Sequence, residues 1–245
     1  MSFRVIPVPA YGCEDVAVAT HGSDEGAVFT GTEDGTIWHI HDDGRQVDRV
    51  AFTGGRPLGI EYDGDGRLVV CDATRGLLRV DPGSGEVEIV MEGLAFANGV
   101  ALAADESFVA VAESSTRRIA RHWITGDRAG ERDFLVEDLP GYPDNIARGS
   151  DGLVWVAIGS PKDPVIEALM KGPPWLRRQV TKVPEMLQPA PKKRVWTQAY
   201  DAAGVLVRNC DVETREFHMV TGVREHAGRV WMGSLHERGV AVLDL

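Results

Sequence analysis

One short pattern occurs five times in the chain, and it constrains the fold more than any other feature. Each copy opens with a turn-forming residue and then alternates apolar positions with a period of two, which indicates a β-strand. Most copies continue through a polar turn into a second apolar run, as the strands of a β-meander do. The five copies are residues 12–18, 56–62, 96–102, 142–148 and 219–225.

These repeats predict an all-β fold, a β-propeller with five blades. Units of roughly 40 residues with four short strands are typical of propellers, whose blades stand around a central channel. The innermost strand of every blade begins at that channel, so residues at one repeat position converge in space. One such position is occupied, in chain order, by Glu14, Leu58, Asn98, Asp144 and Thr221. Three of the five carry oxygen donors of the kind that Ca²⁺ prefers, with another divalent cation as the alternative.

Composition limits the classes of partner. A chain of 245 residues with 43% hydrophobic residues is long enough for one all-β domain spanning 1–245. A net charge of −11 argues against nucleic acid and anionic membranes, which attract clustered Lys and Arg. The sequence shows neither a signal-peptide pattern nor an apolar run long enough to span a membrane. We therefore expect a cytoplasmic protein that acts on a small-molecule substrate; its oligomeric state is left open.

The fourth unit contains an insertion at about 161–191, where apolar residues follow helical spacing and prolines delimit two short helices. This helical insertion is either a lid over one mouth of the channel or a pair packed on the flank of a blade. Its basic residues beside Trp175 add a third option, peripheral contact with a membrane or a partner. The last unit has room for only three strands, so we expect residues 3–8 to supply its outer strand.

Several runs resemble strictosidine synthase-like proteins, a group related to regucalcin/gluconolactonase, paraoxonase and diisopropylfluorophosphatase. The runs are 96–102, 112–115, 139–146, 152–157 and 225–235. The resemblance implies a propeller of six blades and a central calcium held by one Glu, two Asn and one Asp. Position by position, the Glu corresponds to Glu14, one Asn to Asn98 and the Asp to Asp144. The second Asn has no counterpart, because one blade of the family pattern is absent after about Val90.

The hypothesis that follows is a calcium-dependent hydrolase of a lactone or ester, or of a phosphotriester, in which the cation polarises the substrate oxygen. Asp144 is a candidate nucleophile or base, and His218 and His226 are candidate general bases. Taken singly, Glu14, Asn98 and Asp144 are ordinary turn residues, but the repeat position that they share favours metal ligation. A single His is more often a structural residue than a general base. Thr221 stands where the resemblance places the glutamate of strictosidine synthase, which argues against its amine–aldehyde condensation. The alternative is a propeller without catalysis that serves as a binding scaffold.

Overall fold

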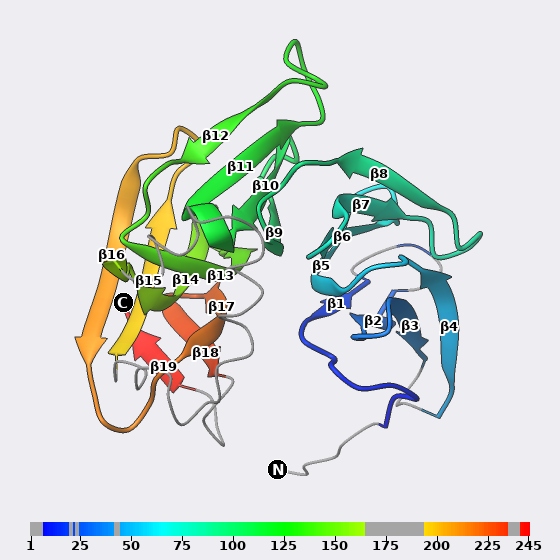
Figure 1. Ribbon diagram of the computed structural model, residues 1–245, viewed down its shortest axis with the longest axis horizontal. Coiled ribbons are helices and arrows are strands. Elements are labelled where there is room, and N and C mark those ends of the chain that lie inside the picture. The colour runs from blue at the N-terminus through cyan, green and yellow to red at the C-terminus, as the bar shows by residue number, and fades with distance from the viewer. Residues whose placement is uncertain (1–6, 20–21, 23–24, 42–44, 165–193, 235–240) are drawn as a thin grey trace.

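The computed structural model describes residues 7–19, 22, 25–41, 45–164, 194–234 and 241–245. Their strands form five antiparallel sheets, each built from consecutive strands and arranged around a common centre (Figure 1). The predicted five-bladed propeller is therefore confirmed. Sequence-adjacent strands pair throughout, because short turns join apolar runs whose alternation leaves one face of each strand for packing.

The first two sheets each have four strands, and their inner strands lie within the first two copies of the repeat. The first contains β1 (Val16–Val18), β2 (Val28–Gly31), β3 (Thr36–Ile40) and β4 (Val47–Phe52). The second contains β5 (Pro57–Tyr62), β6 (Leu68–Asp72), β7 (Gly76–Val80) and β8 (Val87–Met91).

The other three sheets complete the arrangement. The third contains β9 (Ala97–Leu102), β10 (Phe108–Glu113), the 3₁₀ turn η2 (Ser114–Thr116), β11 (Arg118–Trp123) and β12 (Arg132–Val136). The fourth contains β13 (Gly141–Arg148), β14 (Val154–Pro161), β15 (Arg194–Tyr200) and β16 (Leu206–Glu213). The fifth contains β17 (Val220–His226), β18 (Arg229–Ser234) and β19 (Ala241–Asp244).

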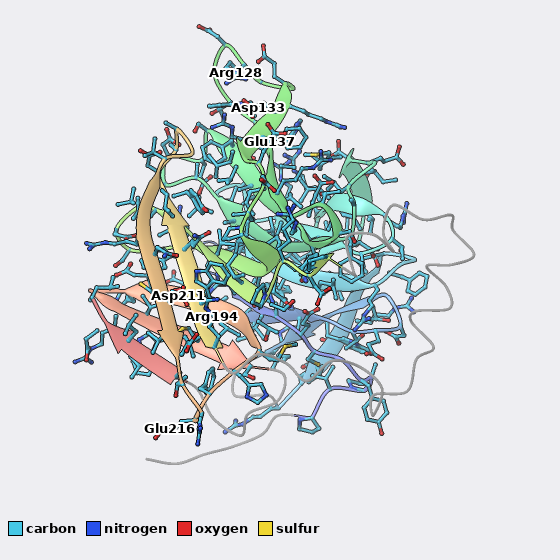
Figure 2. All side chains as sticks on the ribbon, turned by 60° about the vertical axis from the view of Figure 1, so that its left-hand side comes forward. Arg128, Asp133, Glu137, Arg194, Asp211 and Glu216 are labelled. Atoms are coloured by element: carbon cyan, nitrogen blue, oxygen red, sulfur yellow. The ribbon has the colours of Figure 1, made fainter. Side chains whose placement is uncertain are left out.

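The hydrophobic core lies between neighbouring sheets. Phe108 and Ile146, each 1% exposed, belong to one cluster that joins the third and fourth sheets. Trp155, fully buried, belongs to another that joins the fourth and fifth. Burying an aromatic or branched side chain contributes roughly 1.5–3 kcal/mol, so these interfaces set how the sheets are oriented. Polar pairs occupy the periphery, where Figure 2 shows Arg194 beside Asp211 on the outer strands β15 and β16.

Glycines in the inner strands bring the sheets close together at the centre. A Cβ atom placed on Gly59 would lie 2.7 Å from the Asn98 carbonyl oxygen on the next sheet. One placed on Gly99 would lie 2.5 Å from the Cα atom of Asn145, again on the next sheet. Only glycine permits such an approach of two backbones, which explains the glycine that follows the key position in these repeats.

The junction between the fifth and the first sheet, here called the wide step, is looser than the others. Gly222 has the same repeat position as Gly59 and Gly99. Apart from its chain neighbours, the described atoms within 4 Å of a Cβ there belong to Gly233, at 3.7 and 3.8 Å. β17 is not among the strands packed closely on β1, whereas β1 packs on β5, β5 on β9, β9 on β13 and β13 on β17. The apolar side chains Val16 and Val18 on β1 are each 50% exposed.

Some expectations fall on other parts of the chain. The helical insertion predicted at 161–191 lies outside the described residues from 165 onward. The fifth sheet has three strands within the described part, and of the proposed outer strand at 3–8 only Pro7 and Val8 are described, in no strand. No helix formed by the described residues is both long and apolar enough to cross a membrane.

Candidate metal centre

The inner strands bring together the three predicted ligands, here called the hub cluster: Glu14, Asn98 and Asp144. Glu14 lies two residues before β1, Asn98 is the second residue of β9, and Asp144 lies in β13. The side-chain amide Nδ2 of Asn98 donates hydrogen bonds to Asp144 Oδ1 at 3.2 Å and to Ser114 Oγ at 3.3 Å. Glu14 is close enough for its charge to raise the pKa of Asp144. The cluster therefore joins the first, third and fourth sheets.

Two oxygens of the hub cluster have no hydrogen-bond partner within the described part of the chain. Asn98 is only 5% exposed, and its buried Oδ1 receives no hydrogen bond from any described residue. Oε2 of Glu14 is also buried and receives no hydrogen bond from a described residue. An unsatisfied buried acceptor costs roughly 1–3 kcal/mol, and such groups are rare in native proteins. Both atoms are hard oxygen donors, so a cation between them would offset this cost.

The carboxylates of the cluster hold protons more tightly than ordinary acids. Burial, followed by the charge of Glu14, raises the pKa of Asp144 to about 7, against the opposing hydrogen bonds from Asn98 and the Asn145 backbone. Burial raises the pKa of Glu14 to about 6, with Arg56 lowering it and Asp15 raising it. The buried carboxylates of Glu14 and Asp144 repel one another, so a positive charge placed between them would stabilise both. A proton or a divalent cation can supply it.

The chemistry of this donor set fits calcium. Two carboxylates and one amide give hard oxygen ligands, and water would complete the six to eight that Ca²⁺ takes. The two remaining residues of the repeat position add little: Leu58, 3% exposed, has no donor, and Thr221, 8% exposed, has a hydroxyl. Within the described chain, no three His, Cys, Asp or Glu side chains form a metal-binding group, so an ion here would depend on the amide of Asn98.

The two candidate histidines lie at opposite ends of β17. His218 precedes the strand, and its backbone carbonyl accepts a hydrogen bond from Ser234 Oγ at 2.6 Å. This end is the one near Asp144, because a Cβ on Gly159 would lie 3.5 Å from Asp144 Oδ2 and 3.6 Å from the Val220 carbonyl oxygen. His226 ends β17 and is exposed. Six residues of strand correspond to about 20 Å, so the structure does not bring His226 to the hub cluster.

An ion pair that the sequence reasoning missed crosses the centre. Arg224 on β17 reaches Glu61 on β5 at 3.3 Å and Asp15 at 3.9 Å, the latter just before β1. Asp15 also accepts a hydrogen bond from the Ile60 backbone at 3.2 Å. A signal was present in the repeats, because the third residue after the key position reads Ala17, Glu61, Ala101, Ala147 and Arg224. Because this repeat position converges in space and holds one acid, Glu61, and one base, Arg224, it predicts an ion pair between them.

Comparison with known proteins identifies the family of the chain. The family model of strictosidine synthase matches residues 61–127. Strictosidine synthase-like protein 10 of Arabidopsis thaliana is 34% identical over 183 residues, covering 71% of this chain and 48% of its own length. The adipocyte plasma membrane-associated protein of Salmo salar is 26% identical over 305 residues, covering 89% of this chain and 73% of its own. The chain belongs to the strictosidine synthase-like family.

Solved structures of proteins with low sequence identity share the fold of this strictosidine synthase-like chain. A gluconolactonase from Xanthomonas campestris has a TM-score of 0.58 and 14% identity, over 84% of this chain and 65% of that one. A calcium-binding regucalcin from Agrobacterium tumefaciens has a TM-score of 0.58 and 13% identity, over 86% and 65%. At these identities the likeness concerns the fold. The strictosidine synthase-like chain spans about half the length of the Arabidopsis relative.

Proposed function

We propose that this propeller is a calcium-dependent hydrolase of a small lactone or ester. The observation that carries the proposal is the hub cluster, in which two buried oxygens receive no hydrogen bond from the described residues and two carboxylates have raised pKa values. The calcium-binding regucalcin and the gluconolactonase that share the fold support both halves of the proposal. A phosphotriester, or another divalent cation, is compatible with the same donor set.

The residues of the cluster would divide the work. Glu14, Asn98 and Asp144 would hold the ion, which when bound supplies a Lewis acid for the substrate oxygen. The Asn98 amide fixes the orientation of Asp144 through its hydrogen bond. With a pKa of about 7, Asp144 can accept a proton from water near neutral pH, although a cation beside it would weaken that role. His218, at the same end of β17, is the second candidate base.

Hydrolysis fits this site better than an amine–aldehyde condensation. Thr221 is buried at the repeat position where the family resemblance calls for a glutamate. A hydroxyl does not exchange protons near neutral pH as a carboxylate does. A second candidate function, a binding scaffold without catalysis, is favoured by Leu58, which places an apolar side chain where a further oxygen donor would complete the cluster.

Calorimetry and activity assays test the proposal in sequence. Calcium titrated into chelator-treated protein should give a stoichiometric heat that Glu14→Gln and Asp144→Asn abolish and that the exposed-site control Glu216→Gln leaves in place. Lactones and aryl esters should then be hydrolysed only in the absence of chelator. No heat at millimolar calcium would reject the metal site. A calcium heat without hydrolysis of any substrate would favour the scaffold.

A further inference from the structure

A single serine, Ser114, links the two strands that carry Asn98 and Asp144. It is the first residue of η2, the turn that follows β10. Its hydroxyl Oγ accepts a hydrogen bond from Asn98 Nδ2 at 3.3 Å and donates one to the carbonyl oxygen of Pro143 at 2.6 Å. Pro143 directly precedes Asp144 in β13. Ser114 therefore joins the third sheet to the fourth next to two of the three proposed ligands.

The hydroxyl of Ser114 has one hydrogen, and the carbonyl of Pro143 takes it. A carbonyl oxygen can only accept, so in this contact of 2.6 Å the serine is the donor. Toward Asn98 the serine oxygen is left with lone pairs and can only accept. It must then face the nitrogen of the Asn98 amide, because facing Oδ1 would bring two acceptors together. Ser114 therefore determines which end of this amide points toward it.

This orientation explains why Asn98 Oδ1 has no hydrogen bond from the described residues. The two hydrogens of Nδ2 go to Ser114 Oγ at 3.3 Å and to Asp144 Oδ1 at 3.2 Å. The oxygen at the other end of the amide is directed away from both acceptors, and it is buried. A rotated amide would turn Oδ1 toward Ser114 and Asp144 and would withdraw a donor oxygen from the proposed ion.

The second hydrogen bond of Ser114 supports the irregular backbone that carries Asp144. The pairing of β13 with β14 shifts between Pro143 and Ile146, which places a β-bulge at Asp144. Bulges re-aim side chains and leave part of a ladder unpaired, so the bulged segment gains from hydrogen bonds made elsewhere. The serine supplies one of these at the Pro143 carbonyl, directly before the bulge.

The backbone of η2 holds Ser114 in place for this task. The N–H of Ser114 donates to the Phe96 carbonyl at 3.2 Å, and the N–H of Ser115 donates to the Ala95 carbonyl at 3.2 Å. Both acceptors lie just before β9, the strand of Asn98. A side chain on a backbone that is fixed in this way is already positioned for its partners, so it can impose an orientation on a neighbouring amide.

We propose that Ser114 is a positioning residue of the hub cluster, which turns the Asn98 amide so that Oδ1 is presented to the ion and which holds the bulge that carries Asp144. The inference rests on the proposed calcium-dependent function wherever Oδ1 is called a ligand; the orientation of the amide does not need the ion. Removing an outer residue that orients a metal ligand typically weakens metal binding by roughly 10- to 100-fold.

The orientation is measured first, in chelator, by nuclear magnetic resonance of isotope-labelled protein. The side-chain amide signals of Asn98, assigned by their loss in Asn98→Asp, report how fast the two Nδ2 hydrogens exchange with solvent. Ser114→Ala should speed this exchange by about fivefold, because one hydrogen loses its acceptor. Ser114→Thr keeps the hydroxyl and should restore slow exchange. Ser115→Ala, which removes a hydroxyl from the next position of η2, is the matched control.

Calcium binding is measured second, by calorimetry. Ser114→Ala should weaken calcium by about tenfold or more, whereas Ser114→Thr and Ser115→Ala should stay within about twofold of the wild type. Thermal unfolding in chelator checks that each variant is folded. A general loss of packing would not be reversed by Ser114→Thr, so rescue by this variant identifies the hydroxyl as the group that acts.

The outcomes separate this inference from the proposed function. Unchanged amide exchange in Ser114→Ala, or equal effects of Ser114→Ala and Ser115→Ala, overturns the role of Ser114 even where the wild type binds calcium and hydrolyses esters. Exchange that depends on Ser114 in a protein that binds no calcium upholds the orientation and rejects the metal site. Should Ser114→Thr fail to fold, the comparison of the two alanine variants decides alone.

Discussion

Asp144→Asn should make the calcium-free protein more stable at pH 8. A carboxyl whose pKa is about 7 in the folded state and 3.8 in the ordinary state holds its proton more tightly when the protein is folded. Its destabilising effect is absent below pH 4, grows as pH rises through the interval to about 7, and is complete above it. Three pKa units correspond to about 4 kcal/mol as an upper limit. Proton sharing with Glu14 reduces our expectation to about 2 kcal/mol.

The free energy of unfolding in urea tests this, measured with chelator at pH 5 and pH 8. The wild type should lose about 1.3 kcal/mol more between these two pH values than Asp144→Asn does, because about two of the three pH units over which the effect grows lie above pH 5. Asparagine keeps an acceptor for the Asn98 amide, so the hydrogen bond at 3.2 Å has a counterpart in the variant. Glu216→Gln, at a site far out in Figure 2, controls for the loss of one acidic charge. Calcium should stabilise the wild type at pH 8 and leave Asp144→Asn unaffected.

The reasoning fails if Asp144→Asn unfolds more easily than the wild type at pH 8 in chelator. It fails equally if both proteins show the same dependence on pH, because the substitution removes the group whose titration is invoked. A variant that is more stable but still gains stability from calcium would keep the electrostatic account and reject Asp144 as a ligand.

Three further predictions concern the stability of the propeller. Gly99→Ala should lower the free energy of unfolding in urea by at least about 2 kcal/mol, because its Cβ would meet the Asn145 backbone. Gly222→Ala, at the same repeat position, should change it by less than about 0.5 kcal/mol. Equal effects of the two substitutions would contradict the wide step. Asp133 pairs with the Arg121 guanidinium through two hydrogen bonds of 2.7 Å, which lowers the pKa of Asp133 to about 2. Because this carboxylate is partly exposed, Asp133→Asn should lower the free energy of unfolding in urea by only about 1 kcal/mol at pH 7, and by progressively less as pH falls from 4 to 2. A loss of stability that does not depend on pH would show that the ion pair is not its cause. Arg224→Met should speed proteolysis of the native protein, because it removes the ion pairs that link β17 to Glu61 and Asp15. An unchanged cleavage rate would show that other contacts hold the wide step together.

The fold could be read from the sequence because its signal is repeated. Alternating apolar residues define each copy of the repeat, and five copies average out local ambiguity, so each copy overlaps the inner strand of one sheet. The convergence of Asn98 on Asp144 followed from repeat register alone, and the 3.2 Å hydrogen bond confirms that these two meet. The wide step could not be predicted in this way. Gly59, Gly99 and Gly222 are the same residue at the same position, and only the structure shows that a Cβ on the third would have no described atom of another sheet within 4 Å.

The wide step follows from how propeller sheets pack. Each junction is set by side chains buried between two sheets, such as Phe108 and Trp155, and these fix the angle at that junction without reference to the others. In this chain the described sheets pack most loosely between the last and the first, where β17 is not among the strands packed closely on β1. Arg224 spans that junction with a long side chain, and a cavity of about 230 Å³ lies beside it. The hydrogen-bonded pair of the proposed metal site, Asn98 and Asp144, lies away from this junction, between the third and fourth sheets, whose inner strands β9 and β13 pack closely.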